Sequence, residues 1–112
     1  ILLNQRHPPT LILLDDVNHA LHPTAQQRLV AVLRALTAGP APVQVVATSH
    51  SPYILDAVPP EAVQVFALRP DGTVAIKPLS AHPEAEAHRG ILSSGQLWTL
   101  DDEQRWVLED AP

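Results

Sequence analysis

Two acids and a histidine directly follow short apolar stretches of the chain. Residues 11–14 are all Leu or Ile, which predicts a strand buried on both faces, and Asp15 and Asp16 come next. A second, mostly apolar stretch at residues 43–47 is followed by Thr-Ser-His at residues 48–50. Because one helix-length segment separates the two stretches, they predict a right-handed crossover with two parallel strands. The acids and the histidine would then meet at the carboxyl edge of one sheet, where open α/β sheets bind ligands.

Carboxylates and an imidazole at one sheet edge suit a metal ion and an attacking water. One of Asp15 and Asp16 could hold hydrated magnesium while the other orients or deprotonates a water, since neighbouring side chains point apart. His50 could bond a phosphate oxygen or that water. The simpler alternatives are that the acids cap the following turn and that His50 satisfies local backbone groups.

A second group of possible ligands lies between the two stretches. His19 and His22 are three positions apart and, with Asp15 or Asp16, could bind a transition metal. Pro23 and the loop position argue against the helix that would align them. A metal-dependent hydrolase is therefore the weakest of the hypotheses, and exposed loop residues are its alternative.

Composition narrows the class of protein. The 112 residues are 46% hydrophobic and 4% aromatic, which predicts one small domain with an aliphatic core. A net charge of -5 without a basic stripe argues against direct nucleic-acid binding, and the lack of cysteine excludes disulfides and thiolate metal sites. No stretch approaches the roughly 20 apolar residues of a membrane span. With no signal-peptide pattern, the cytoplasm is the expected location.

A helix with an apolar stripe is expected to connect the two strands. Pro23 suits its first position, and Gly39-Pro40 ends it. The stripe recurs at helical spacing, and polar residues are expected on the outer face. The stripe comprises Leu29, Val30, Leu33 and Leu36, and the outer face comprises Gln26, Gln27 and Arg34.

The second half of the chain predicts a short helix over residues 52–57 and then a hairpin. Residues 63–68 and 73–77 pair around the turn Pro70-Asp71-Gly72, and this hairpin should form an antiparallel edge of the sheet.

A helical tail should follow the hairpin. Helices are predicted over residues 83–92 and 101–109, the latter with a capping box from Asp101 and Gln104. Trp98 and Trp106 should anchor this tail. At the other end of the chain, residues 1–6 fit either a helix or a strand.

Three motifs occur in the order and spacing of a known family. Residues 11–16 resemble a Walker B strand, Leu21-His22-Pro23 resembles the end of a D-loop, and residues 45–52 resemble a switch motif of the Thr-His-Ser-Pro type. Together, residues 10–58 resemble the C-terminal half of an ABC-type AAA ATPase, closest to the RecF/SMC/OLD-like bacterial ATPases.

The resemblance implies a fold and a set of roles. The fold would be α/β, part of a three-layer P-loop NTPase with parallel strands and an antiparallel edge hairpin. Asp15 would hold Mg²⁺ through water, Asp16 would stand at the catalytic glutamate, and Ser49 and His50 would contact ATP, with His50 as the switch. The D-loop residues, which meet a partner subunit in the family, would be Asn18, His19, Leu21, His22 and Pro23.

The chain also departs from the family. Asp16 is one methylene shorter than glutamate, Val17 replaces a frequent proline, and Asn18 replaces a frequent acid. No phosphate-loop pattern of the type G-x-x-x-x-G-K-[ST] occurs in the 112 residues. Since the chain opens on Ile1 rather than Met, we expect a piece of a longer protein whose amino-terminal half supplies that loop. The isolated chain is therefore expected to lack activity.

The signature-like string at residues 92–96 follows the switch histidine, whereas the family's signature precedes Walker B. We therefore expect this string to be a tail loop.

The leading hypothesis is ATP binding and hydrolysis by a longer ABC-like AAA ATPase, of which residues 1–112 form the C-terminal part as a single domain. Its parts would be a Walker B to switch core at 10–58, a hairpin at 62–79 and a helical tail at 82–112. The partner would be a second copy or the missing amino-terminal half, with DNA contacted only through the full-length protein. The alternative is a non-catalytic interaction or dimerisation module, favoured by an exposed sheet edge.

Overall fold

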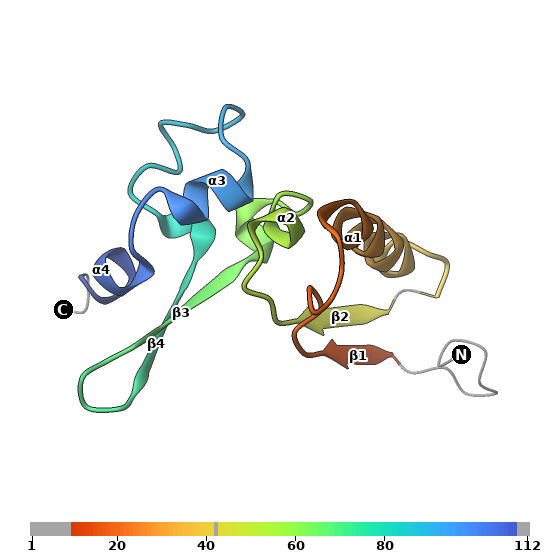
Figure 1. Cartoon of the computed structure of the whole chain (residues 1–112), viewed down its shortest axis with the longest axis horizontal. Helices are drawn as coiled ribbons and strands as arrows, with labels where there is room; N and C mark the ends of the chain where they lie inside the picture. Colours follow the sequence, from red (N-terminus) through yellow and green to blue (C-terminus); the bar gives the residue numbers. More distant parts are fainter. Residues whose placement is uncertain (1–9, 42, 110–112) are drawn as a thin grey trace. The chain divides into compact units, whose positions relative to one another are not determined.

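The computed structural model describes residues 10–41 and 43–109, and Figure 1 shows the order of their elements. The chain divides into two compact units, Ile1–Ser51 and Pro52–Pro112, each described here by itself. The prediction for residues 1–6 lies outside the described residues, and the single-domain organisation stays a prediction. The elements are β1 (Leu11–Leu14), α1 (Pro23–Thr37), β2 (Gln44–Ala47), α2 (Pro52–Leu55), η2 (Pro60–Ala62), β3 (Gln64–Leu68), β4 (Val74–Pro78), η3 (Leu79–Ala81), α3 (Ser94–Thr99) and α4 (Glu103–Leu108).

The first unit contains the predicted parallel crossover. Strands β1 and β2 pair in parallel, from Leu11 opposite Gln44 to Leu14 opposite Ala47. Helix α1 connects them and begins at Pro23, as predicted, because the fixed φ of proline suits the first turn. This pairing brings the carboxyl ends of both strands to one edge.

Two predictions about burial in this unit are wrong. Strand β1 was expected to be buried on both faces, yet only Ile12 is buried, while Leu11 and Leu13 are 46% and 70% exposed. Within the described residues, only one face of this two-stranded sheet is packed. Gln26, expected on the outer face of α1, is buried because its amide bonds with Leu21 and Ser51.

The second unit is built on the predicted hairpin. Strands β3 and β4 pair antiparallel, with Phe66 opposite Ile76, around a turn in which Gly72 has a φ of +89°. Hydrogen bonds from Thr73 hold the pKa of the Asp71 carboxyl below its usual range. The hairpin forms a two-stranded sheet of its own in the described residues, and its inner face packs against the core of its own unit. That it borders the parallel sheet, as in a three-layer fold, stays a prediction.

The hairpin places small side chains inward and large ones outward. The buried core comprises Val65, Ala67, Ala75, Leu79, Leu97, Trp106 and Val107, with Trp98 packed against it. This confirms both tryptophans as anchors of the tail. The outward side chains Phe66, Leu68, Val74 and Ile76 are about half exposed, so apolar residues line both faces of the hairpin.

The tail differs from its prediction in three places. Residues 83–92 form successive turns rather than a helix, since Gly90 takes a positive φ of +78° and i to i+3 bonds such as Ile91 N–H to His88 O predominate. Residues 94–96, predicted to lie in a loop, are helical, because Ser93 and Gln96 form a capping box that starts α3. Helix α4 is capped by Asp102 rather than Asp101, through a 2.9 Å bond from the Gln104 N–H.

No helix in the described parts of the chain has the length and apolar character needed to cross a membrane.

A buried histidine makes the stability of the second unit depend on pH. The His82 ring meets Trp106 edge-on, with 5.0 Å between centroids, and its Nδ1 accepts from the Glu84 N–H at 3.0 Å. Burial lowers the pKa of His82 below its ordinary 6.5, and the charges of Asp101 and Glu84 oppose this only in part. Because the folded pKa is depressed, the contribution of the neutral ring is complete above 6.5 and is lost as the pH falls toward the folded value.

We expect the urea concentration at the midpoint of unfolding to decrease when the pH is lowered from about 7.5 to about 5.5. His82→Asn keeps an acceptor for the Glu84 N–H but does not titrate, so this variant should show a smaller fall. An equal fall in both proteins would contradict the assignment to His82.

Gly95 lies in α3 where a side chain would collide with the Pro52 carbonyl and Asp56. A Cβ at this position would lie 3.0 Å from the Pro52 carbonyl carbon and would overlap the Pro52 oxygen and the Asp56 carboxylate. We expect Gly95→Ala to lower the free energy of unfolding by about 1–3 kcal/mol in urea titrations. Gly39→Ala is the matched control, because a Cβ there makes only ordinary contacts of 3.7 and 3.8 Å. Equal stability of the two variants would contradict this packing.

Candidate functional site

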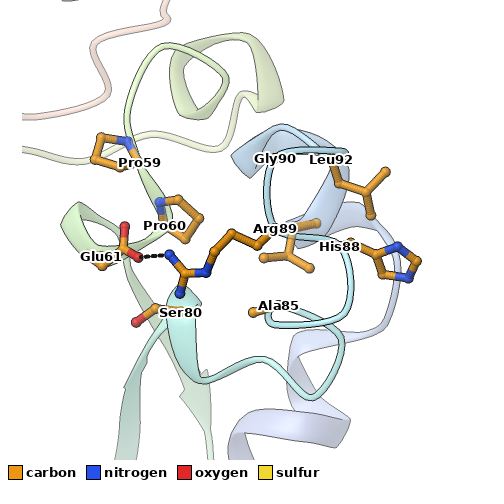
Figure 2. A pocket seen from close by; sticks show the side chains of 10 residues that line it. Pro59, Pro60, Glu61, Ser80, Ala85, His88, Arg89, Gly90 and Leu92 are labelled. Atoms are coloured by element: carbon orange, nitrogen blue, oxygen red, sulfur yellow. Dashed lines mark hydrogen bonds and ion pairs between the residues drawn. The ribbon is translucent and has the colours of Figure 1, made fainter.

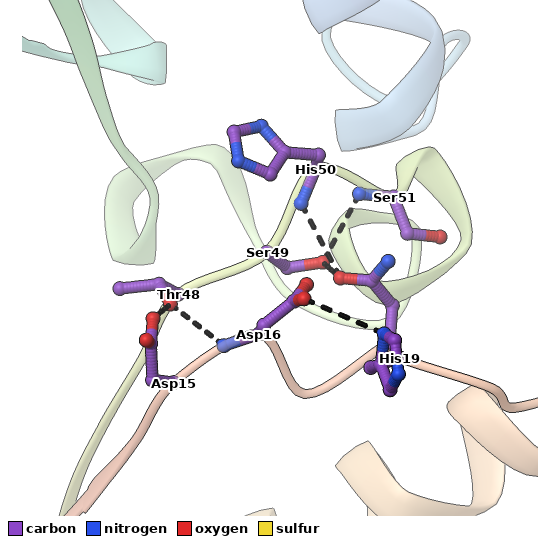
Figure 3. Close-up of polar contacts among 8 residues, drawn as sticks. Asp15, Asp16, His19, Thr48, Ser49, His50 and Ser51 are labelled. Atoms are coloured by element: carbon purple, nitrogen blue, oxygen red, sulfur yellow. Dashed lines mark hydrogen bonds and ion pairs between the residues drawn. The ribbon is translucent and has the colours of Figure 1, made fainter.

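The carboxyl ends of β1 and β2 are joined through one hydroxyl. The Thr48 hydroxyl donates to Asp15 Oδ1 and accepts from the Asp16 N–H at 2.8 Å (Figure 3). The backbone closes the same junction, because the Val17 N–H donates to the Thr48 carbonyl at 3.1 Å. The predicted meeting of the acids with the segment that carries His50 is therefore present in the structure.

The backbone turns sharply after β1, and this turn aims the two acids differently. Asp16 has a φ of +53°, in the left-handed region that aspartate tolerates better than most residues. Its carboxylate Oδ2 lies 3.8 Å from His19 Nδ1, while the Asp15 carboxylate accepts from Thr48. Both acids are exposed, so each can be reached by solvent or a ligand.

The next polar group ties the loop after β1 to the segment after β2. Asn18 Oδ1 accepts from the Ser49 hydroxyl at 2.7 Å and from the His50 N–H at 3.4 Å. The Ser49 hydroxyl oxygen in turn accepts from the Ser51 N–H at 3.0 Å. In Figure 3 the dashed lines at Ser49, His50 and Ser51 mark these bonds, and the His50 ring points away from them.

A buried amide on α1 supports the segment of residues 48–51. Gln26, in the first turn of α1, donates from Nε2 to the Leu21 carbonyl at 2.9 Å, and its Oε1 accepts from the Ser51 hydroxyl. Gln26 and Ser51 are both buried, so each provides a hydrogen-bond partner to a polar group that would cost free energy if it were buried without one.

The remaining predicted site residues have local structural contacts. His22 is the N-cap of α1, with Nδ1 accepting from the Thr24 N–H at 3.3 Å, and Pro23 is the first helical residue. His19 and Leu21 are exposed. Over residues 10–41 and 43–109, no three His, Asp or Glu side chains gather in a group that could hold a metal ion.

The donor set at the strand ends suits a hydrated hard cation. Asp15 and Thr48 present a carboxylate and a hydroxyl oxygen, and Mg²⁺ prefers one or two carboxylates while keeping several waters. They border an open hollow of about 340 Å³, whose walls also include Leu13, Leu14 and Val46. The residues present therefore fit magnesium held through water.

A second cavity, of about 220 Å³, lies in the second unit and contains no predicted site residue. Arg89 spans it toward Glu61 at 3.4 Å, as Figure 2 shows. Hydrogen bonding and charge from Glu86, with the Glu61 charge, raise the pKa of Arg89. The cation is thus already paired with carboxylates.

A comparison with known families identifies the first unit. The profile of the family described as "AAA domain, putative AbiEii toxin, Type IV TA system" matches residues 1–56. The chain belongs to this family. A search of curated proteins finds no match. All the site contacts described above, from Asp15 to Ser51, lie within the matched part of the AAA domain.

Sequence analysis missed two residues of the site in this AAA domain. Thr48 was seen only as part of a motif, although its place directly after β2 is a signal for a strand-end contact. Gln26 was assigned to solvent, although it precedes the buried Val30 by four positions and therefore shares its face of the helix.

Ala20 shows backbone strain in the loop of the AAA domain that connects β1 to α1. Its φ is +59°, a conformation that disfavours a Cβ. We expect Ala20→Gly to raise the free energy of unfolding by about 0.5–1 kcal/mol, the strain relief less the entropy cost of glycine. Ala31→Gly, on the exposed face of α1, should lower it by about 1 kcal/mol. Loss of stability in both variants would contradict strain at Ala20.

Proposed function

We propose that this AAA domain supplies the Walker B, D-loop and switch elements of an ATPase of the RecF/SMC/OLD-like type. The observation that carries the proposal is the Thr48 hydroxyl between Asp15 and the Asp16 backbone. It joins a strand-end carboxylate suited to hydrated Mg²⁺ to the segment that contains His50. Phosphoryl transfer depends mainly on positioning and charge neutralisation, which such an arrangement can provide.

Each residue of the site would then have a definite task. Asp15, oriented by Thr48, would hold Mg²⁺ through water, and bound magnesium would neutralise charge on the transferred phosphate. Asp16 would orient the attacking water with its exposed carboxylate. Ser49 and His50 would face the nucleotide, with His50 as the hydrogen-bond donor that detects its terminal phosphate.

The phosphate-binding loop must come from outside these residues, because the sequence lacks its glycine and lysine pattern. The exposed apolar face of the β1–β2 sheet supports a partner element there, since Leu13 and Val46 border the hollow next to Asp15. We propose that an amino-terminal half packs on this face and that residues 18–23 meet a second copy. DNA would be reached only through the full-length protein, and the cytoplasm is its proposed location.

The outward face of the β3–β4 hairpin favours a second candidate function. Phe66, Leu68, Val74 and Ile76 expose apolar surface on a sheet whose other face is already packed. A non-catalytic interaction or dimerisation module would use this face. Such a module would self-associate or bind a protein partner without binding nucleotide.

The test uses MgATP binding by calorimetry and ATP turnover, measured on this chain and on a longer protein that also carries a phosphate loop. We expect no turnover by the chain alone. In the longer protein, Asp15→Asn should keep the acceptor for Thr48 yet lower kcat by about 100-fold, because the negative charge is lost. Asp71→Asn, the same change in the hairpin turn, is the control and should leave kcat unchanged.

If Asp15→Asn and Asp71→Asn gave the longer protein equal turnover, Asp15 would have no part in the mechanism. A longer protein that neither binds nor hydrolyses ATP but forms dimers would favour the interaction module.

A further inference from the structure

We infer that Asn18 is a positioning residue that holds the His50 segment in place through the Ser49 hydroxyl. This inference rests on the proposed ATPase function and extends it to a residue outside the expected catalytic set. Asn18 was expected only to contact a partner subunit. In the structure its side-chain oxygen accepts hydrogen bonds from Ser49 and His50.

The contact is specific in its chemistry. One oxygen, Asn18 Oδ1, accepts both the Ser49 hydroxyl at 2.7 Å and the His50 N–H at 3.4 Å. Because the Ser49 hydroxyl gives its proton to Asn18, its oxygen lone pairs are directed to the Ser51 N–H at 3.0 Å. A single side chain thereby orders the backbone on both sides of His50.

Residues 49 and 50 have little apolar packing beside the contact with Asn18. His50 is exposed, and Ser49 and Asn18 are only partly buried, so apolar packing does not hold the loop. On the opposite side, Ser51 is held by the buried Gln26. His50 thus stands between two polar attachments, one to the loop after β1 and one to α1.

An amide suits this position better than an apolar residue of equal size. Two donors converge on one acceptor, and a side chain without an acceptor would leave the Ser49 hydroxyl and the His50 N–H to solvent. An aspartate would keep the acceptor geometry, which makes Asn18→Asp the conservative variant and Asn18→Leu the disruptive one. Asn18→Ala removes the same acceptor without adding a bulky side chain.

The first measurement is amide hydrogen exchange on the 112-residue chain, which requires no nucleotide. We expect Asn18→Leu and Asn18→Ala to speed exchange of the His50 amide, which loses its acceptor, by about tenfold, the factor that corresponds to loss of one hydrogen bond. Asn18→Asp should retain wild-type exchange. Gln27→Ala, on the exposed face of α1, is the control and should also retain it. Unchanged exchange in Asn18→Leu would overturn the inference.

The second measurement is ATP turnover by the longer protein that carries a phosphate loop. We expect Asn18→Leu to lower kcat by about tenfold, approaching the loss in His50→Ala, while KM for ATP changes by less than about twofold. Asn18→Asp should restore kcat. A general structural defect would instead alter KM and thermal stability, and it would not be corrected by aspartate.

The outcomes separate this inference from the proposed function. If the longer protein hydrolyses ATP and Asp15→Asn abolishes turnover while Asn18→Leu does not, the ATPase stands and the role of Asn18 is refuted. If the wild-type longer protein shows no MgATP turnover, both fall together. Should Asn18→Leu fail to fold, Asn18→Ala decides the question by the same two measurements.

Discussion

The hydrogen bonds of the Thr48 hydroxyl are the constraint on which the first unit depends. The parallel register sets Leu14 opposite Ala47, so the next residues of both strands, Asp15 and Thr48, become neighbours. A hydroxyl can donate and accept at once, and Thr48 uses both capacities to hold the carboxylate and the following N–H. The sharp turn at Asp16 and the direction of the loop after it follow from this junction.

Buried polar contacts connect the segments after the two strands to helix α1. Gln26 connects the Leu21 carbonyl with Ser51, so α1 supports the loop before it and the segment after β2. An unsatisfied buried amide costs about 1–3 kcal/mol, which is why such a group is retained only where all its partners are in place. The site therefore rests on a polar network more than on apolar packing.

The second unit is held together by a different principle. Its hairpin turns small residues inward, where Ala67 and Ala75 leave room for Trp106, and turns Phe66 and Ile76 outward. The signature-like residues of this unit are used internally, because the Ser93 hydroxyl at 2.6 Å and the Gly95 N–H at 3.0 Å both donate to Asp56. A carboxylate occupies the donors that a phosphate would need, which explains why a motif in the wrong place in the chain has a structural use.

The sequence by itself determined the elements whose signals are local. Apolar runs, Pro23 and the turn at Gly72 were sufficient to predict β1, β2, the start of α1 and the hairpin, because strand and turn preferences act over a few residues. The meeting of Asp15 and Asp16 with the His50 segment also followed from local signals, through the handedness of the crossover.

Only the tertiary structure decided which side chains reach one another. The burial of Gln26, the two bonds of Thr48 and the acceptor role of Asn18 depend on contacts between residues more than 20 positions apart, as for Gln26 with Ser51 and Asn18 with Ser49. The tail was mispredicted for a related reason. The local sequence allows more than one capping residue near Ser93 and Asp102, and it allows either a helix or turns over residues 83–92. Packing against Trp106 and Leu97 selects between these alternatives.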